Sequence, residues 1–256
     1  MYIWYWIRQG GWVAYRVIWL LFIGLYFSPL SAMNYCHLVS CNSPDIQNGQ
    51  NIKVLYTAAL IDDFYEERKA EYLRSLQALQ SINRIPYIVE SIKSASFFDE
   101  CEVPVFYSKT NNPRFCNKGI NEAISMLAAI NFYNFDENDI IVKLTGRYFF
   151  INESLFSVIE LETQKDAYVK HTGIHSQPIY EIDYFTGCFA MRCKYLKMFL
   201  NELDLQDMES KATPIEWELG KFLKRHPEVR VHHVDMLHVI AHGFASSYNV
   251  GPPKLY

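Results

Sequence analysis

Apolar segments rich in β-branched residues alternate with amphipathic segments from residue 52 onward. Residues 52–60, 85–92 and 103–109 have the composition of strands, whereas residues 65–82 place tyrosines and leucines at helical spacing between charged residues. Strands that alternate with helices indicate an α/β domain with a mostly parallel central sheet flanked by helices. Ligands of such open sheets bind at the carboxyl ends of the strands, so we expect the functional residues there.

The alternation continues to residue 240, and no internal repeat is visible. A long helix is expected from Asn117, and residues 139–143 are expected to form a central strand covered on both faces. The later predicted elements are a short strand at 166–171, a strand and a helix within 184–203, a helix at 213–226 and a last strand at 228–240.

The first 32 residues differ from the rest of the chain. Residues 17–27 are an uncharged apolar run with arginines before it and small residues after it, as in a signal peptide or a signal anchor. Residues 33–51 are polar and are expected to form a linker or stem before the folded domain at 52–256. These features predict a membrane-anchored protein with its domain in the Golgi or ER lumen, or a secreted one. A start at Met33 would instead leave a cytosolic protein.

The six cysteines all follow this segment, and their even number fits an oxidising compartment. Cys36 and Cys41 are close enough in sequence to pair, as are Cys101 and Cys116. No cysteine spacing resembles a zinc site.

The composition argues against nucleic acid as a partner. The net charge is −4 and the pI is near 6.1, so the chain lacks the basic surface that phosphate backbones require. Half of the residues are hydrophobic, which is enough for one domain with a substantial core.

Two cations flank a glycine at the end of the predicted central strand. Lys143, Thr145, Gly146, Arg147 and Tyr148 are expected at its carboxyl end. A guanidinium matches phosphate oxygens in geometry, and a glycine allows close approach of the backbone. The segment therefore predicts an anion site, with structural ion pairs to nearby carboxylates as the alternative for both cations.

The start of the long helix is a second candidate anion site. Asn117, Lys118, Gly119 and Asn121 lie where free backbone N–H groups and the helix dipole favour an anion. The same residue types also cap helices without binding anything. Neither a P-loop nor a dinucleotide-binding glycine motif is present.

A third group of candidates lies further along the chain. Thr186 and Gly187 begin the segment Thr-Gly-Cys-Phe-Ala-Met-Arg, and Glu216 and Glu218 lie near the start of the next helix. A carboxylate held in a cleft can act as a general base towards a hydroxyl group. Glutamates in the first turn also stabilise a helix on their own, which is the alternative interpretation.

Histidines and one cysteine suggest other chemistry. A zinc site is conceivable from the segment that holds His232, His233, Asp235, His238 and His242, but HExxH is absent and the valines between them favour a strand. Cys188 follows Gly187, yet a strand cysteine in such a place is more often buried and inert.

Taken together, these segments resemble the order of parts in small GT-A-type glycosyltransferases. The similar parts are a first strand that ends in Thr57-Ala58, the helix with Asn-Lys-Gly, the strand with Thr-Gly and the acidic helix after it. The resemblance implies a single GT-A-like, Rossmann-type domain. It also implies that Thr57, Asn117 and Asn121 border the nucleotide, that Thr186 and Gly187 border the sugar and acceptor, and that Glu216 or Glu218 is the base.

The chain departs from that family at one place. The family has Asp-x-Asp after the central strand, where it holds a divalent metal, whereas this chain has Lys143-Leu-Thr-Gly-Arg-Tyr148. Lysine and arginine would repel Mn²⁺ or Mg²⁺ and could neutralise a diphosphate directly. We therefore expect a transferase that needs no cofactor, with Arg147 and Lys143 at the diphosphate of a nucleotide sugar.

The expected partners are a nucleotide-sugar donor, a glycan, lipid or protein acceptor, and a membrane contacted through the N-terminal segment. A competing hypothesis is a secreted or membrane-tethered protein of the same fold that binds carbohydrate without catalysis. The enzyme hypothesis requires Glu216 or Glu218 in the cleft beside Arg147, and the binding hypothesis does not.

Overall fold

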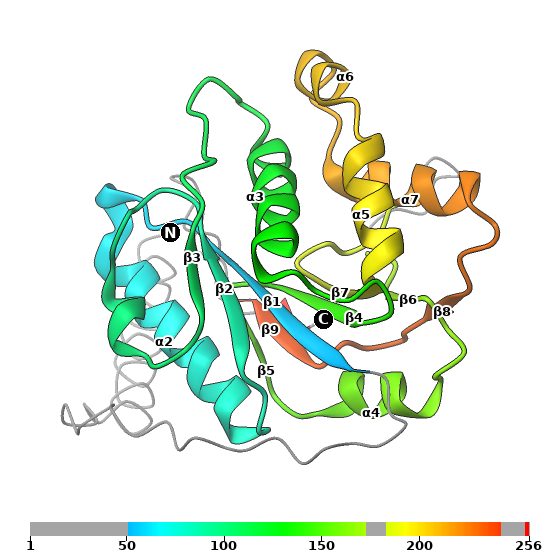
Figure 1. The fold of residues 1–256 in the computed structure, drawn as a ribbon, viewed down its shortest axis with the longest axis horizontal. Coiled ribbons are helices and arrows are strands. Elements are labelled where there is room, and N and C mark those ends of the chain that lie inside the picture. The colour runs from blue at the N-terminus through cyan, green and yellow to red at the C-terminus, as the bar shows by residue number, and fades with distance from the viewer. Residues whose placement is uncertain (1–50, 173–182, 242–253, 256) are drawn as a thin grey trace, which may run out of the picture. The chain divides into compact units, whose positions relative to one another are not determined.

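The computed structural model describes residues 51–172, 183–241 and 254–255 (Figure 1). These residues belong to one compact unit, Asn42–Tyr256. The predicted signal or anchor segment, 1–32, lies outside the described residues, and so does the stem except for residue 51. In the described ranges, no helix is both long and apolar enough to cross a membrane.

The core of the fold is a seven-stranded sheet in the order β3-β2-β1-β4-β7-β6-β8. Its strands are β1 (Ile52–Ala58), β2 (Pro86–Glu90), β3 (Val105–Tyr107), β4 (Ile140–Thr145), β6 (Ala167–Val169), β7 (Cys188–Arg192) and β8 (Val231–His233). β7 is antiparallel to β4 and β6, and every other neighbouring pair is parallel. The predicted α/β class with a mostly parallel sheet is therefore confirmed.

A smaller sheet has the order β10-β9-β5 and contains β5 (Tyr148–Phe150), β9 (Val239–Ala241) and β10 (Lys254–Leu255). The prediction of one last strand at 228–240 is wrong, because this stretch forms β8 in the large sheet and β9 in the small one. Between them, buried Val234 and Leu237 hold the connection against the core, and His238 has a left-handed backbone with φ of 53°. This break in the extended backbone separates the two strands.

Helices cover both faces of the large sheet (Figure 1). The helical segments are η1 (Asp62–Phe64), α2 (Tyr65–Ser81), η2 (Phe97–Glu100), α3 (Lys118–Tyr133), α4 (Ser154–Leu161), α5 (Cys193–Glu202), α6 (Leu205–Ser210) and α7 (Ile215–Arg225). The sequence pattern missed α4 and α6, which have only eight and six residues, and the three-residue strand β5. Elements this short contain too few residues to establish a period.

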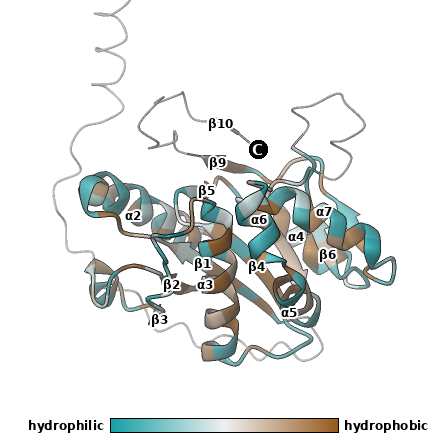
Figure 2. Cartoon of the chain, turned by 90° about the horizontal axis from the view of Figure 1, so that it is seen from above, coloured by the Kyte–Doolittle hydropathy of each residue, from teal (hydrophilic) through white to brown (hydrophobic). Residues whose placement is uncertain are grey.

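Alternation along the strands creates two hydrophobic cores. On β1 and β4, Val54 and Val142 face the core formed with α2 and α4, whereas Leu55 and Ile141 face the core formed with α3, α5 and α7. In Figure 2 the hydrophobic colour is concentrated on the central strands and α3, whereas α2 is mostly hydrophilic. Both faces of the central strands are thus buried, as their continuous apolar composition predicts.

Gly146 lies at the end of β4, where two tyrosine rings press on the backbone. The hydroxyl of Tyr56 donates to the Gly146 carbonyl at 2.7 Å. A Cβ at Gly146 would lie 2.7 Å from the Tyr72 ring and 2.8 Å from the Tyr56 ring, which is closer than real Cβ contacts. The glycine does allow a close approach, but the groups that approach are aromatic rings of the core.

We therefore predict that Gly146→Ala destabilises the domain. The added methyl group must displace buried rings, and overpacking of this kind costs about 1–3 kcal/mol in the free energy of unfolding. Chemical denaturation followed by circular dichroism measures the loss. Gly119→Ala is the milder comparison: its Cβ would also be tight, at 3.1 Å from Ile215, so we expect a smaller loss than at Gly146. An equal loss in the two variants would contradict the packing role of Gly146.

Candidate functional site

A cavity of about 940 Å³ opens at the edge of the large sheet where β1 and β4 end. Because β7 is antiparallel, its start lies at this same edge, and the amide of Thr145 donates to the Gly187 carbonyl at 2.9 Å. The volume suits a small-molecule site. Strand ends and helices together supply the lining, which includes Thr57, Arg68, Asn121, Thr145, Thr186 and Glu216.

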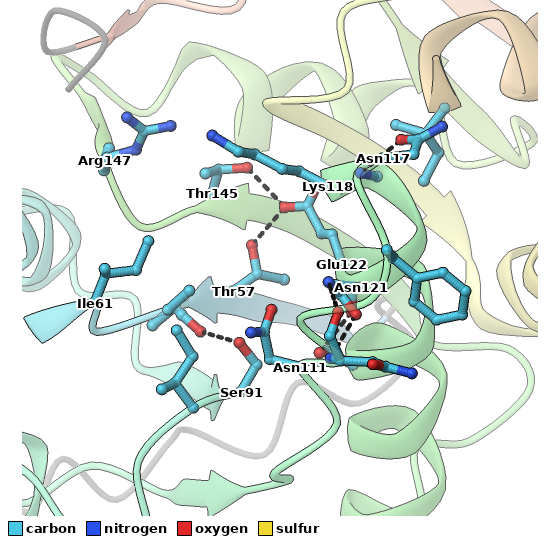
Figure 3. Close-up of a pocket in the computed structure, with 18 of the residues that line it drawn as sticks. Thr57, Ile61, Ser91, Asn111, Asn117, Lys118, Asn121, Glu122, Thr145 and Arg147 are labelled. Atoms are coloured by element: carbon cyan, nitrogen blue, oxygen red, sulfur yellow. Dashed lines mark hydrogen bonds between the residues drawn. The ribbon is translucent and has the colours of Figure 1, made fainter. Parts of the chain in front are cut away.

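One carboxylate oxygen in the cavity wall gathers several donors (Figure 3). Oε1 of Glu122, on α3, accepts from the hydroxyl of Thr57 at 2.8 Å and from the hydroxyl of Thr145 at 3.0 Å. The same oxygen lies 2.8 Å from the ammonium nitrogen of Lys143. This cluster ties the helix to the ends of β1 and β4.

The pKa of the Glu122 carboxyl lies below its ordinary value. Burial alone would raise this pKa, but the attraction of the Lys143 ammonium and the hydrogen bonds from Lys143, Thr57 and Thr145 outweigh the burial. Glu122 is therefore ionised at neutral pH and acts only as an acceptor. The sequence pattern did not single out Glu122, because a glutamate in the early turns of a helix is common.

Lys143 does not line the cavity. Its side chain is 0% exposed, and its ammonium group donates to the Thr145 hydroxyl and to the Thr186 carbonyl, both at 2.6 Å, as well as pairing with Glu122. An ammonium group has three donors, and these three acceptors use them all. The structural ion pair, the alternative considered for this lysine, is thus the arrangement found, and no donor remains for a diphosphate.

Arg147 lines the cavity, as the sequence pattern predicts, and so does Lys118. Among the described residues, neither cation lies within 4.0 Å of a carboxylate oxygen. Burial raises the pKa of the Glu71 carboxyl on α2, and the Arg147 guanidinium acts in the opposite direction. The two charges therefore influence each other without forming an ion pair. In Figure 3 the nitrogen ends of Arg147 and Lys118 lie on the same side of the Glu122 cluster.

Arg68 is a cation of the cavity that sequence reasoning missed. It is only 8% exposed, and its Nη1 atom donates to the Ala59 carbonyl at 2.5 Å, whereas its Nε atom has no hydrogen-bond partner in the described part of the chain. In the sequence it belongs to the charged face of an amphipathic helix, and no signal distinguishes it there. Only the fold of the β1–α2 connection over this helix shows that it is buried.

Protein groups already occupy much of the predicted anion site at the start of α3. Asn117 caps the helix by accepting from the Gly119 amide at 3.0 Å, and its side-chain nitrogen donates to the carbonyls of Met208 and Thr213. The Glu209 carboxylate accepts from the amides of Cys116 at 2.8 Å and Asn117 at 3.1 Å. The local preference for an anion is real, but a carboxylate of α6 satisfies it here.

Asn121 closes one rim of the cavity. Its Oδ1 atom accepts from the amide of Asn112 at 2.8 Å, and its Nδ2 atom donates to the carbonyl of the same residue at 3.1 Å. Both Asn121 and Asn112 line the cavity. The two hydrogen bonds fix the loop before α3 in place.

The structure separates the two candidate bases on α7. Glu216 lines the cavity and accepts from the Thr186 hydroxyl at 2.7 Å. Glu218 pairs with Lys221 at 2.7 Å and is not among the lining residues. Because Thr186 lies two residues before the start of β7, the hydrogen bond ties the approach to that strand to the first turn of α7.

The other predicted residues also divide into those that line the cavity and those that do not. Tyr148, Thr186 and Gly187 line the cavity, whereas Gly146 does not. A Cβ at Gly187 would lie 2.6 Å from the Phe185 ring and 2.8 Å from the Tyr148 ring, so close packing requires this glycine too.

The histidine segment does not form a metal site in the described residues, where no group of three or more His, Cys, Asp or Glu side chains converges. Instead, the His233 ring stacks on His171 at a centroid distance of 5.0 Å, and His171 stacks on Tyr184 at 4.4 Å. Burial and the neighbouring His171 lower the pKa of His233. His242 lies outside the described residues.

The described cysteines are not arranged as the sequence spacing allows. Cys116 is an exposed free thiol, so it does not form the pair with Cys101 that the sequence spacing would allow. Cys188 and Cys193 are buried free thiols, and burial raises the pKa of Cys188 to about 12 and that of Cys193 to about 11. Cys36 and Cys41 lie outside the described residues. A nucleophilic role for Cys188 is therefore unfavourable, because the thiolate is the reactive form.

The sequence matches no protein-family model and no curated protein. Solved structures with a similar arrangement include a candidate nucleotide-diphospho-sugar transferase from Desulfovibrio desulfuricans G20, with 10% identity over 73% of this chain and 80% of that chain and a TM-score of 0.48. A glycosyltransferase involved in glycosylation of the major capsid of PBCV-1 has 12% identity over 73% and 82%, with a TM-score of 0.43. Apo GlyE of Streptococcus pneumoniae TIGR4 has 10% identity over 73% and 46%, with a TM-score of 0.44. Similarity this distant assigns no function to the chain.

The cysteine geometry predicts selective alkylation of the native protein. Brief treatment with iodoacetamide at pH 8, followed by peptide mapping, should label Cys116, because it is exposed. Cys188 and Cys193 should be labelled only after unfolding, since burial suppresses both access and ionisation. Labelling of Cys188 at the rate of Cys116 would restore a nucleophilic role for Cys188.

Proposed function

We propose that this protein is a glycosyltransferase that moves a sugar from a nucleotide-sugar donor to a hydroxyl group of a glycan, lipid or protein. One observation carries the proposal. A single cavity at the carboxyl edge of the sheet has Arg147 and Lys118, which have no carboxylate partner among the described residues, and Glu216, a carboxylate oriented by one hydrogen bond. Transfer from a diphosphate donor needs both a group for the leaving anion and a base for the acceptor.

The cations suit the leaving group. As the bond between the anomeric carbon and the phosphate oxygen breaks, negative charge develops on the nucleoside diphosphate. The guanidinium of Arg147 can form two parallel hydrogen bonds to phosphate oxygens, and Lys118 adds a second positive charge to the lining of the same cavity. Arg68 adds a third positive charge to the cavity lining, although its Nε atom is buried and its Nη1 atom donates to the Ala59 carbonyl.

Glu216 suits the role of base. The acceptor oxygen forms the new bond to the anomeric carbon, and its proton must pass to a nearby acceptor group. The Glu216 carboxylate lines the cavity, and the hydrogen bond from Thr186 engages only Oε1. Glu218 lacks this position, since Lys221 holds it outside the cavity lining.

A Mg²⁺ ion at a phosphate site is usually held by one or two carboxylates together with substrate phosphates and water. Three of the four carboxylates that line the cavity already have partners in the protein. Asp62 is paired with Lys93, Glu122 with Lys143, and Glu209 with two backbone amides. No described group of three acidic, histidine or cysteine side chains converges there. We therefore propose a metal-independent transfer in which Arg147 and Lys118 neutralise the diphosphate.

The domain-level proposals follow from the sequence. Residues 52–256 form a GT-A-like catalytic domain, residues 33–51 a stem, and residues 1–32 a signal peptide or membrane anchor. This arrangement suits glycan synthesis in the Golgi or ER lumen, where nucleotide sugars are supplied, and a start at Met33 would place the same chemistry in the cytosol.

We predict that nucleoside diphosphates stabilise the protein and that Arg147 carries much of this effect. At a ligand concentration of about 100 Kd, linkage predicts a rise in Tm of about 5–10 °C for a domain of this size. Excess chelator should leave the shift unchanged, whereas Arg147→Ala should weaken binding about 10–100-fold through loss of charged hydrogen bonds. Differential scanning fluorimetry and calorimetry measure both effects.

Arg114→Ala is the matched control for this measurement, because Arg114 lies in the loop before α3 but not in the cavity lining. Loss of the shift in chelator would contradict metal independence. The absence of a shift with any nucleotide would overturn the transferase proposal and favour the carbohydrate-binding hypothesis.

We predict that substitutions of the two glutamates of α7 have different effects on turnover. Glu216→Gln should lower kcat about 10²–10⁴-fold, the usual contribution of a general base, while leaving nucleotide binding intact. Glu218→Gln should lower kcat less than about tenfold, because its partner is Lys221. Steady-state kinetics with a donor identified by the thermal shift measures both. Equal losses, or a larger loss for Glu218→Gln, would contradict the assignment of the base.

A further inference from the structure

The three acceptors of the Lys143 ammonium belong to three separate elements. Glu122 is on α3, Thr145 ends β4, and Thr186 precedes β7. All three acceptor residues line the cavity, although Lys143 itself does not. A single buried charge thus connects three parts of the cavity wall.

Thr186 is held from two sides. Its carbonyl accepts from the Lys143 ammonium at 2.6 Å, and its hydroxyl donates to Oε1 of Glu216 at 2.7 Å. The residue lies before the paired register of β7, which begins with Cys188 opposite Leu144. Its position therefore depends on the lysine as well as on the strand that follows.

The ion pair alone does not explain this arrangement. Neutralising the Lys143 charge requires only Glu122, whereas the third ammonium proton is directed to a carbonyl whose residue contacts the carboxylate of another helix. Thr186 is 4% exposed and Lys143 is 0% exposed, so water does not compete for the hydrogen bond between them. These two residues therefore form a buried connection between the partly exposed carboxylates of Glu122 and Glu216.

We propose that Lys143 is a positioning residue that holds Thr186, and through it the Glu216 carboxylate, in a fixed relation to the Glu122 cluster. The inference rests on the proposed function for the role of Glu216 as base. The coupling itself is a property of the protein without substrate and can be tested separately. It gives Lys143, which lies near the end of β4, a role in arranging the base in place of contact with the diphosphate.

A double-mutant cycle in thermal stability tests the coupling. Thr186→Val removes the hydrogen bond to Glu216, and Glu122→Gln/Lys143→Met removes the ion pair without leaving one charge buried alone. We expect Thr186→Val to lower Tm by about 2–4 °C in the otherwise unchanged protein and by less than half as much in the Glu122→Gln/Lys143→Met background. Equal shifts in the two backgrounds would overturn the proposal.

Two further variants keep the cycle interpretable. Glu218→Gln should shift Tm equally in both backgrounds, because its partner Lys221 is outside this network. If Glu122→Gln/Lys143→Met does not fold, Lys143→Arg takes its place in the cycle, since it keeps the charge but changes the direction of the donors. Additive behaviour in that cycle would equally overturn the proposal.

Kinetics then tests the consequence for the reaction. Thr186→Val and the Glu122→Gln/Lys143→Met variant should lower kcat about 10²-fold, the effect of a misplaced catalytic group, with KM for the donor changed much less. Thr186→Ser should recover most of the loss, because it keeps the hydroxyl. If Lys143 had only a structural role, a folded Glu122→Gln/Lys143→Met variant would retain kcat, and that result would overturn the positioning role.

The two measurements separate the inference from the function on which it rests. Coupled Tm shifts in a protein without transferase activity on any nucleotide sugar would leave the network in place and remove the proposed function. Additive Tm shifts in an active transferase would keep the function and remove the positioning role of Lys143.

Discussion

Lys143 places an ammonium group at the centre of a seven-stranded sheet, and Glu122 neutralises it inside the protein. An isolated buried charge is very costly, so neither residue is tolerated without the other, and removing one partner of such a pair costs about 3–5 kcal/mol. The pair also holds α3 against β4 and directs the ends of β1 and β4 towards one carboxylate oxygen. The position of the polar cavity wall follows from this one interaction.

Charge pairing inside the wall determines which charges remain for a ligand. The carboxylates of Glu122 and Glu209 have internal partners, and so does Lys143. Arg147 and Lys118 line the same space without a carboxylate within 4.0 Å among the described residues. The cavity lining therefore offers the positive charges of Arg147 and Lys118 and one oriented carboxylate, Glu216, beside Thr186. This combination favours a ligand with an anionic part and a neutral hydroxyl-bearing part.

Much of the fold could be predicted because the large elements carry a clear period. The helices α2, α3, α5 and α7 and the strands of the large sheet follow the alternation read from the sequence. The prediction of a single strand at 228–240 was wrong because the valines there continue a strand pattern through His238. The left-handed backbone of His238 interrupts the extended chain. The short helices α4 and α6 gave no periodic signal.

The sequence predicted where the candidate site lies better than it predicted the role of each residue there. By itself the sequence determined that Arg147 follows a central strand, that Asn117 begins a helix and that Glu216 and Glu218 lie in the first turns of another, because strand ends and helix starts are local properties. Only the tertiary structure decided that Lys143 is internal, that Arg68 is buried at the cavity and that Glu216 lines the cavity while Glu218 pairs with Lys221. The reason is physical: pairing of charges depends on which elements meet in space, and β7 brings Thr186 beside β4 only because it is antiparallel.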